Sequence, residues 1–190
     1  DEDTAFMPQS PYAIAKLAAH HLVRNYRDSY GIHASSGILF NHESPRRGET
    51  FVTRKITLAA ANIRLGHQKF IELGNLSAKR DWGHAEDYVK AMHLMVQQET
   101  PDDYVISTGE THSVEEFLNE VWRHANLGEL SEHLKINPKY FRPQEVPYLL
   151  GDSSKAKRNL NWEPKYSFSD LARDMYQHDY NKIVKEKRSK

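Results

Sequence analysis

SPYAIAK, residues 10–16, opens a predicted helix and carries the most informative pair of side chains in the sequence. Ser10 suits the N-cap and Pro11 the first helical position, and apolar residues then recur at helical spacing until Gly31. The pattern predicts a helix over residues 11–30. On that helix Tyr12 and Lys16, one turn apart, share a face.

The Tyr12–Lys16 pair is suited to proton transfer. A phenol loses its proton near pH ~10, so a tyrosine acts as a base at neutral pH only where a nearby cation stabilises the phenolate. Tyrosine and lysine at this spacing also occur on many surface helices, so the spacing alone favours a pair without a chemical role. Other parts of the sequence are needed to distinguish a proton-transfer pair from a surface pair without a chemical role.

Strands and helices alternate after this helix. The short apolar run at 32–40 ends in the polar segment 41–48, which is typical of a buried strand that delivers a loop at its carboxyl end, where open α/β sheets bind ligands. Ser113 and Glu116 form a capping box for a later helix, and Asp87 suits the N-cap of another or lies just inside it. The remaining predictions are helices over 51–65, 88–98 and from 167 onward, strands over 69–73, 79–82 and 104–107, and an irregular stretch at 128–148.

This alternation predicts an α/β fold, namely the C-terminal part of a Rossmann-like parallel sheet with a smaller mixed α/β lobe. We assign residues 1–50, with parts of 84–110, to the Rossmann-like domain. Residues 51–83 and 111–176 form the smaller lobe, and residues 177–190 form a C-terminal tail that is basic from Lys185 onward.

The composition excludes several classes of protein. Lysine plus arginine and aspartate plus glutamate both number 26, so no net charge draws the chain to nucleic acid or to a membrane surface. Cysteine is absent and the 11 histidines show no recognised ligand spacing, so no metal site is predicted. No apolar run approaches the ~20 residues that cross a bilayer, and the acidic start is unlike a targeting peptide, so we expect a cytoplasmic protein without a membrane partner.

Several longer strings carry a resemblance to a known family. The Tyr12/Lys16 pair, followed after the next strand by Phe40-Asn41, resembles the extended short-chain dehydrogenase/reductase superfamily. The other strings narrow the resemblance to the GDP-mannose 4,6-dehydratase family, and it covers about residues 8–176. They are GILFNHESPRRG (37–48), FVTRK (51–55), LGNLSAKRDWGH (73–84), YVISTG (104–109), RPQE (142–145) and LNW (160–162).

The resemblance implies an NADP-dependent dehydration. Tyr12 would take the proton of the hexose 4-hydroxyl while hydride leaves C4 for NADP, and Lys16 would hold the nicotinamide ribose. Water is then lost across C5 and C6, and hydride returns to C6, which gives GDP-4-keto-6-deoxymannose, a first step toward GDP-fucose. The implied cofactor contacts are Tyr12, Lys16, Leu39, His42 and Arg47.

The substrate implied by the resemblance is GDP-mannose. A guanidinium can grip phosphate through paired hydrogen bonds that a lysine cannot reproduce, so Arg80 and Arg142 are the candidates for the diphosphate. Glu145 can accept hydrogen bonds from the ribose hydroxyls. The other implied contacts are Asn41 on the sugar-diphosphate side and Val52 and Lys55 beside guanine.

Simpler interpretations exist for some of these side chains. Arg80 could pair locally with Asp81, which is worth only ~0 to 1 kcal/mol on a surface. His42 and Arg46 could stabilise their own loop. Glu43 is expected to lie in the loop after the strand and is not assigned a catalytic role.

The family carries a glycine-rich cofactor loop and a Ser/Thr-x-Glu element before the tyrosine, and neither precedes Tyr12 in this sequence. The chain therefore resembles the C-terminal half of such an enzyme and is expected to be inactive by itself. Two alternatives stay open: a GDP-sugar-binding module without turnover, and an oligomerisation piece. We expect a homo-oligomer, a dimer or a tetramer, in which the helix over 11–30 contacts a second copy.

Overall fold

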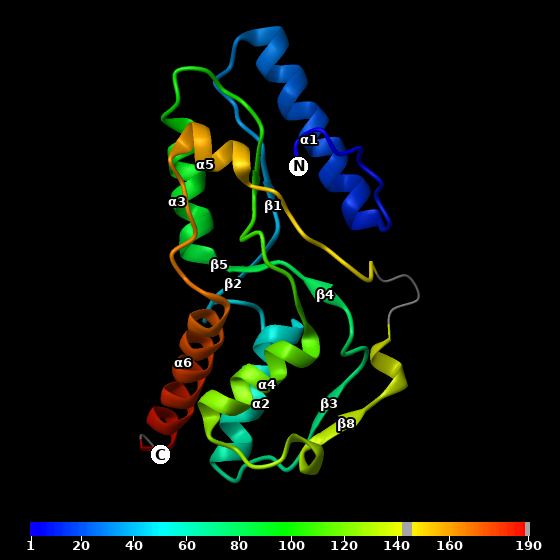
Figure 1. The fold of residues 1–190 in the computed structure, drawn as a ribbon, viewed down its shortest axis with the longest axis vertical. Coiled ribbons are helices and arrows are strands. Elements are labelled where there is room, and N and C mark those ends of the chain that lie inside the picture. The colour runs from blue at the N-terminus through cyan, green and yellow to red at the C-terminus, as the bar shows by residue number, and fades with distance from the viewer. Residues whose placement is uncertain (142–145, 189–190) are drawn as a thin grey trace. The chain divides into compact units, whose positions relative to one another are not determined.

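The computed structural model describes residues 1–141 and 146–188, which Figure 1 shows as a ribbon. The chain divides into two compact units. Unit 1 comprises residues 1–42, 81–110 and 149–165, and unit 2 comprises residues 43–80, 111–148 and 166–190. The paired strands and the helices between them confirm the α/β class, because both units contain a parallel strand pair.

Unit 1 is built around the parallel pair of β1 and β6, in which Gly37 lies opposite Tyr104 and Leu39 opposite Ile106. In Figure 1, α3 and α5 lie on one side of this pair and α1 on the other. The core between α3, α5 and β6 contains Tyr88, Met95 and Trp162. The elements are α1 (Pro11–Tyr30), β1 (Gly37–Leu39), β5 (Trp82–His84), α3 (Ala85–Val96), β6 (Tyr104–Ile106) and α5 (Ser154–Leu160).

Unit 2 combines a second parallel pair, β3 and β8, with an antiparallel pair, β4 and β7. Its three longer helices, α2, α4 and α6, pack against one another. Their buried faces include Ile56, Phe117 and Met175. The elements are α2 (Val52–Arg64), β3 (Ile71–Leu73), β4 (Lys79–Arg80), β7 (His112–Ser113), α4 (Val114–Ala125), β8 (Leu134–Ile136), α6 (Phe168–Arg188) and the 3-10 helices Leu130–Glu132 and Pro138–Tyr140.

Two predicted helix starts are confirmed by their caps. The Ser10 hydroxyl accepts a hydrogen bond from the Ala13 N–H, and Gly31 ends α1 in the left-handed conformation at φ 62°. At α4 the Ser113 hydroxyl accepts from the Glu116 N–H, and the Glu116 carboxylate accepts from the Ser113 N–H. This reciprocal pair is the capping box that the sequence predicts.

The strand predicted over 32–40 is shorter than expected. The Ser36 carbonyl still accepts from the Tyr104 N–H of β6, but the Ser36 N–H donates to the Asp103 carboxylate and the Ser35 hydroxyl accepts from the Asp102 N–H, so the regular strand begins only at Gly37. The polar segment after Phe40 is not wholly a loop either, since β2 (Asn41–Glu43) is a strand. The expectation that Glu43 lies in that loop is therefore wrong, and its side chain is only 2% exposed.

Asp87 does not cap α3. The helix begins earlier than predicted, and its N-cap is His84, whose ring nitrogen accepts from the Glu86 N–H. Asp87 lies inside the first turn, and its carboxylate accepts a hydrogen bond from the Lys165 N–H at 2.9 Å. The Trp162 Nε1–H donates to the Asp87 carbonyl at 2.8 Å, so this residue ties α3 to the segment after α5.

The sequence also missed α5 and β8. A helix as short as α5 shows too few turns for a periodic pattern, and β8 lies in the stretch that was expected to be irregular. Within the described residues no helix is long and apolar enough to span a bilayer. The cytoplasmic location stays a prediction.

Candidate active site

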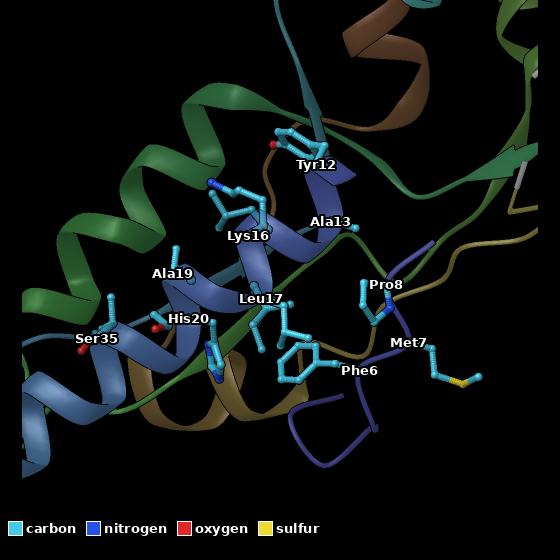
Figure 2. A pocket seen from close by; sticks show the side chains of 15 residues that line it. Phe6, Met7, Pro8, Tyr12, Ala13, Lys16, Leu17, Ala19, His20 and Ser35 are labelled. Carbon is cyan, nitrogen blue, oxygen red and sulfur yellow. The ribbon is translucent and has the colours of Figure 1, made fainter. Parts of the chain in front are cut away.

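Tyr12 and Lys16 both lie in the first turns of α1, where Ser10 and Pro11 start the helix. Tyr12 is 73% exposed and Lys16 is exposed. Figure 2 shows the two side chains one turn apart on the helix, next to each other along its surface. The structure therefore leaves both side chains accessible to a ligand.

A cavity of about 550 Å³ lies within unit 1 beside these side chains. Its walls come from α1, from residues 6–8 and from residues 35–39, and they include Tyr12, Lys16 and Leu39. Phe6 and His20 line another part of the wall, with their ring centroids 5.0 Å apart (Figure 2). Three of the five predicted cofactor contacts thus line one cavity. The volume of this cavity falls in the ~300–1,000 Å³ range of small-molecule sites.

Asp103 fixes α1 against the strand pair of unit 1. Its carboxylate accepts two hydrogen bonds from the Arg27 guanidinium, at 2.9 and 3.3 Å, and one from the Ser36 N–H at 3.2 Å. Burial alone would raise the pKa of Asp103, but the contacts with Arg27 and Ser36 outweigh burial and hold this pKa below its usual range. His20 lies 3.9 Å from the same carboxylate, and burial lowers the pKa of His20 although Asp103 opposes the shift. Sequence reasoning missed Asp103.

His42 follows Asn41 in β2, and both residues are half-buried. The His42 ring stacks on Tyr88 at a centroid distance of 5.1 Å, and Nδ1 lies 2.8 Å from the Phe40 carbonyl oxygen. Because a carbonyl can only accept, Nδ1 carries the proton in this contact, and the neutral ring then has Nε2 as an acceptor. The ring is held in one orientation, which is compatible both with a cofactor contact and with local stabilisation.

Asp81 organises the residues after β6, and these contacts were not predicted from the sequence. Its fully buried carboxylate accepts hydrogen bonds from the Thr108 N–H and hydroxyl at 2.8 and 2.7 Å, from the Gly109 N–H at 3.0 Å and from the Gly151 N–H at 3.3 Å. These donors hold the Asp81 carboxylate in place. A side chain at Gly151 would collide with Ser107, since an added Cβ would lie 2.4 Å from it.

In unit 2, Lys55 projects from the first turns of α2 and is half-buried. Its ammonium donates to the Glu72 carbonyl oxygen at 2.5 Å and lies 3.7 Å from the ring centroid of Tyr140. Val52, the first residue of α2, is half-buried. On β4, the Arg80 guanidinium donates to the Lys79 and Val146 carbonyl oxygens at 2.8 and 2.7 Å.

Arg47 lies in the loop between β2 and α2. Its guanidinium stacks on the Phe51 ring at 3.6 Å, and its Nε lies 3.1 Å from the Glu43 carboxylate. Burial raises the pKa of Glu43, while the Thr53 hydroxyl and Arg47 oppose this shift.

Arg142 and Glu145 lie outside the described residues. Within the part of the chain that is described, no cluster of three or more histidine, aspartate or glutamate side chains is arranged to hold a metal ion.

Comparison with known proteins gives long sequence matches. A sequence model described as GDP-mannose 4,6 dehydratase matches residues 1–175. The chain is 52% identical over 195 residues to GDP-mannose 4,6 dehydratase of Drosophila melanogaster, covering 94% of this chain and 49% of that relative. It is 53% identical over 186 residues to GDP-mannose 4,6 dehydratase 1 of Arabidopsis thaliana, covering 98% of this chain and 51% of that relative. The chain thus spans about half the length of the curated relatives it matches.

Solved structures share the fold. The chain resembles RMD from Pseudomonas aeruginosa complexed with NADPH, with a TM-score of 0.86 at 19% identity over 95% of this chain and 59% of that one. It also resembles dTDP-glucose 4,6-dehydratase from Bacillus anthracis in complex with NAD, with a TM-score of 0.82 at 20% identity over 97% of this chain and 56% of that one. At these identities the likeness concerns the fold alone.

Proposed function

Because the chain belongs to the GDP-mannose 4,6-dehydratase family, we propose that it supplies the tyrosine–lysine pair and part of the substrate site of an enzyme that converts GDP-mannose to GDP-4-keto-6-deoxymannose. The observation that carries the proposal is the placement of Tyr12 and Lys16 on the wall of one cavity at the start of α1. Unit 1 would be the remainder of the NADP-binding domain, and unit 2 the substrate lobe.

In the proposed reaction Tyr12 takes the proton from the hexose 4-hydroxyl. Lys16 holds the nicotinamide ribose, and its ammonium stabilises the phenolate that Tyr12 forms. The cofactor supplies a temporary acceptor for the C4 hydride, which later returns to C6 after water has left across C5 and C6. Tyr12 and Lys16 fit this cofactor because both are exposed on a cavity of small-molecule size.

The remaining assignments follow the family resemblance. We propose NADP as the cofactor, with Leu39, His42 and Arg47 as further contacts. GDP-mannose would be held by Asn41, Val52, Lys55, Arg80, Arg142 and Glu145. Backbone carbonyl oxygens accept hydrogen bonds from Lys55 and Arg80 and so hold both cationic groups in place, which supports these roles.

A homo-oligomer also belongs to the proposal, with α1 as the contact. None of the residues of α1 is buried, and Ile14, Leu22 and Tyr26 are exposed. Such an apolar surface on a long helix favours a protein partner, and we propose a second copy of the same protein.

Residues 1–190 by themselves are expected to form no 4-keto sugar from GDP-mannose and to bind NADP weakly. The reason is that no glycine-rich turn occurs in this sequence to receive the pyrophosphate, whereas Asn41, Lys55 and Arg80 remain to bind GDP-mannose. Calorimetric titration with NADP and with GDP-mannose, alongside a 4-keto sugar assay, measures all three quantities.

The matched control is a protein that contains this chain at the full length of its relatives, which is expected to form the product. Robust product formation by residues 1–190 alone would contradict the proposal that they are part of the catalytic unit. The absence of product from the longer protein would contradict the proposed reaction.

A further inference from the structure

The loop at residues 44–50, which joins β2 to α2 and carries Arg47, is fastened by a buried arginine. Arg54 on α2 is 5% exposed and Asp179 on α6 is fully buried. The Arg54 Nε donates to both oxygens of the Asp179 carboxylate at 2.9 Å, and Nη2 lies 2.8 Å from Oδ1 in the same ion pair. The other arm of the guanidinium, Nη1, donates to the Arg47 carbonyl oxygen at 2.9 Å and to the Pro45 carbonyl oxygen.

This division of donors indicates what the arginine does. A guanidinium presents five N–H donors in a rigid plane, so one face of the fork can grip a carboxylate while the opposite arm grips backbone carbonyls. An ammonium has no such plane. Asp179 in turn accepts a hydrogen bond from the Thr57 hydroxyl at 2.7 Å, which fixes the carboxylate on the α2 side.

Stability alone is a weak explanation for the pair. A buried ion pair often contributes no more than apolar side chains of the same size would, because both charges lose their hydration. The Pro45 and Arg47 carbonyl oxygens, by contrast, both accept hydrogen bonds from the Arg54 Nη1, which ties the loop backbone to the pair. The pair therefore has a specific effect on the backbone of the 44–50 loop.

The Arg47 side chain is held separately from its backbone. The Glu43 carboxylate is 2% exposed and accepts a hydrogen bond from the Thr53 hydroxyl at 2.6 Å, while Arg47 Nε lies 3.1 Å from the same carboxylate. The Phe51 ring supports the Arg47 guanidinium at 3.6 Å. Backbone and side chain of Arg47 are thus both fixed from within unit 2.

We propose that Arg54 and Asp179 are positioning residues, which hold the 44–50 loop so that Arg47 is presented to the cofactor. The inference rests on the proposed function, since that function makes Arg47 a cofactor contact. Its consequence is that α6, which supplies Asp179, affects cofactor affinity through the loop and without touching the cofactor.

The variant that tests this is Arg54→Lys, in the protein at the full length of its relatives. Lysine keeps the positive charge beside Asp179 but loses the arm that reaches Pro45 and Arg47. Trypsin cleavage after Arg46 or Arg47 is expected to become about tenfold faster, because it requires local opening of the loop. The Kd for NADP is expected to rise about tenfold, with kcat at saturating NADP unchanged.

Arg64→Lys is the matched control, because Arg64 lies exposed in the last turn of the same helix. It is expected to change neither cleavage nor affinity. Asp179→Asn is the second variant. It keeps the Arg54 Nη1 on the loop carbonyls but weakens the ion pair that holds the guanidinium. It is expected to raise the cleavage rate and the Kd for NADP by less than Arg54→Lys does. A thermal melt shows which variants are folded. The cleavage rate and the NADP affinity are then compared with the parent protein for each folded variant.

Faster cleavage together with weaker NADP binding supports the positioning role. Unchanged cleavage, or faster cleavage with unchanged NADP affinity, overturns it and leaves the proposed function intact. A parent protein that binds no NADP is a distinguishable result, because it overturns the proposed function and the positioning role with it.

Discussion

Replacing Tyr12 by phenylalanine is expected to lower kcat by roughly 10²–10⁴-fold while the affinity for GDP-mannose stays nearly unchanged. The phenol oxygen acts mainly in the transition state, where as the phenolate it accepts the proton of the sugar, and it adds little to binding in the ground state. Because Tyr12 is 73% exposed, loss of its hydroxyl is not expected to disturb the fold.

The measurement is the rate of 4-keto sugar formation by the full-length protein, with GDP-mannose affinity from calorimetry. Tyr30→Phe is the matched control, since Tyr30 is an exposed tyrosine at the far end of the same helix. Turnover within a few fold of the parent in Tyr12→Phe would remove Tyr12 from the mechanism.

Asp81→Ala is expected to have the largest effect on stability, a loss of about 2–4 kcal/mol in the free energy of unfolding. The substitution removes a fully buried carboxylate and leaves donors of Thr108, Gly109 and Gly151 without their acceptor. The Gly151 N–H is buried and costs about 1–3 kcal/mol without an acceptor, whereas water can in part replace the lost acceptor at the half-buried Thr108 and the exposed Gly109.

Denaturation in urea, followed by circular dichroism, measures this loss. Asp28→Ala serves as the control because Asp28 is an exposed aspartate of unit 1, 3.8 Å from the Arg27 guanidinium, and its loss is expected to stay within about 0.5 kcal/mol. A loss below about 1 kcal/mol for Asp81→Ala would show that the donors find other partners.

Local signals predicted the helices well. Ser10, Pro11 and Gly31 gave the bounds of α1, and the Ser113–Glu116 capping box gave the start of α4. These signals act within one or two turns of the chain, so they can be read without knowing the fold. The long matching strings added the family, which composition and periodicity alone could not supply.

Interactions between distant segments could not be predicted. Asp81 bonds to residues 27 and 70 positions away, Arg27 to a residue 76 positions away, and Arg54 to a residue 125 positions away. Asp87 was predicted as a cap because its residue type suits that position, but one of its carboxylate oxygens accepts from Lys165, which lies 78 positions away. Polar residues of β2 likewise gave no strand signal.

In the candidate site, too, local features could be predicted from the sequence and contacts between distant segments could not. The one-turn spacing of Tyr12 and Lys16 could be read from the sequence, and the structure adds the cavity that they share with Leu39. The roles of these residues, and those of Arg142 and Glu145 outside the described part of the chain, stay predictions. The support for Arg47 from Glu43, Arg54 and Asp179 could be seen only in the structure.

The most direct test of the account follows one hydrogen atom. The full-length protein is given GDP-mannose that carries deuterium at C4, and the product is analysed by mass spectrometry and NMR. If Tyr12 and Lys16 serve an internal hydride transfer, the product is GDP-4-keto-6-deoxymannose with deuterium in its C6 methyl group. A product whose C6 carries no deuterium, or the absence of any dehydrated product, would contradict the account.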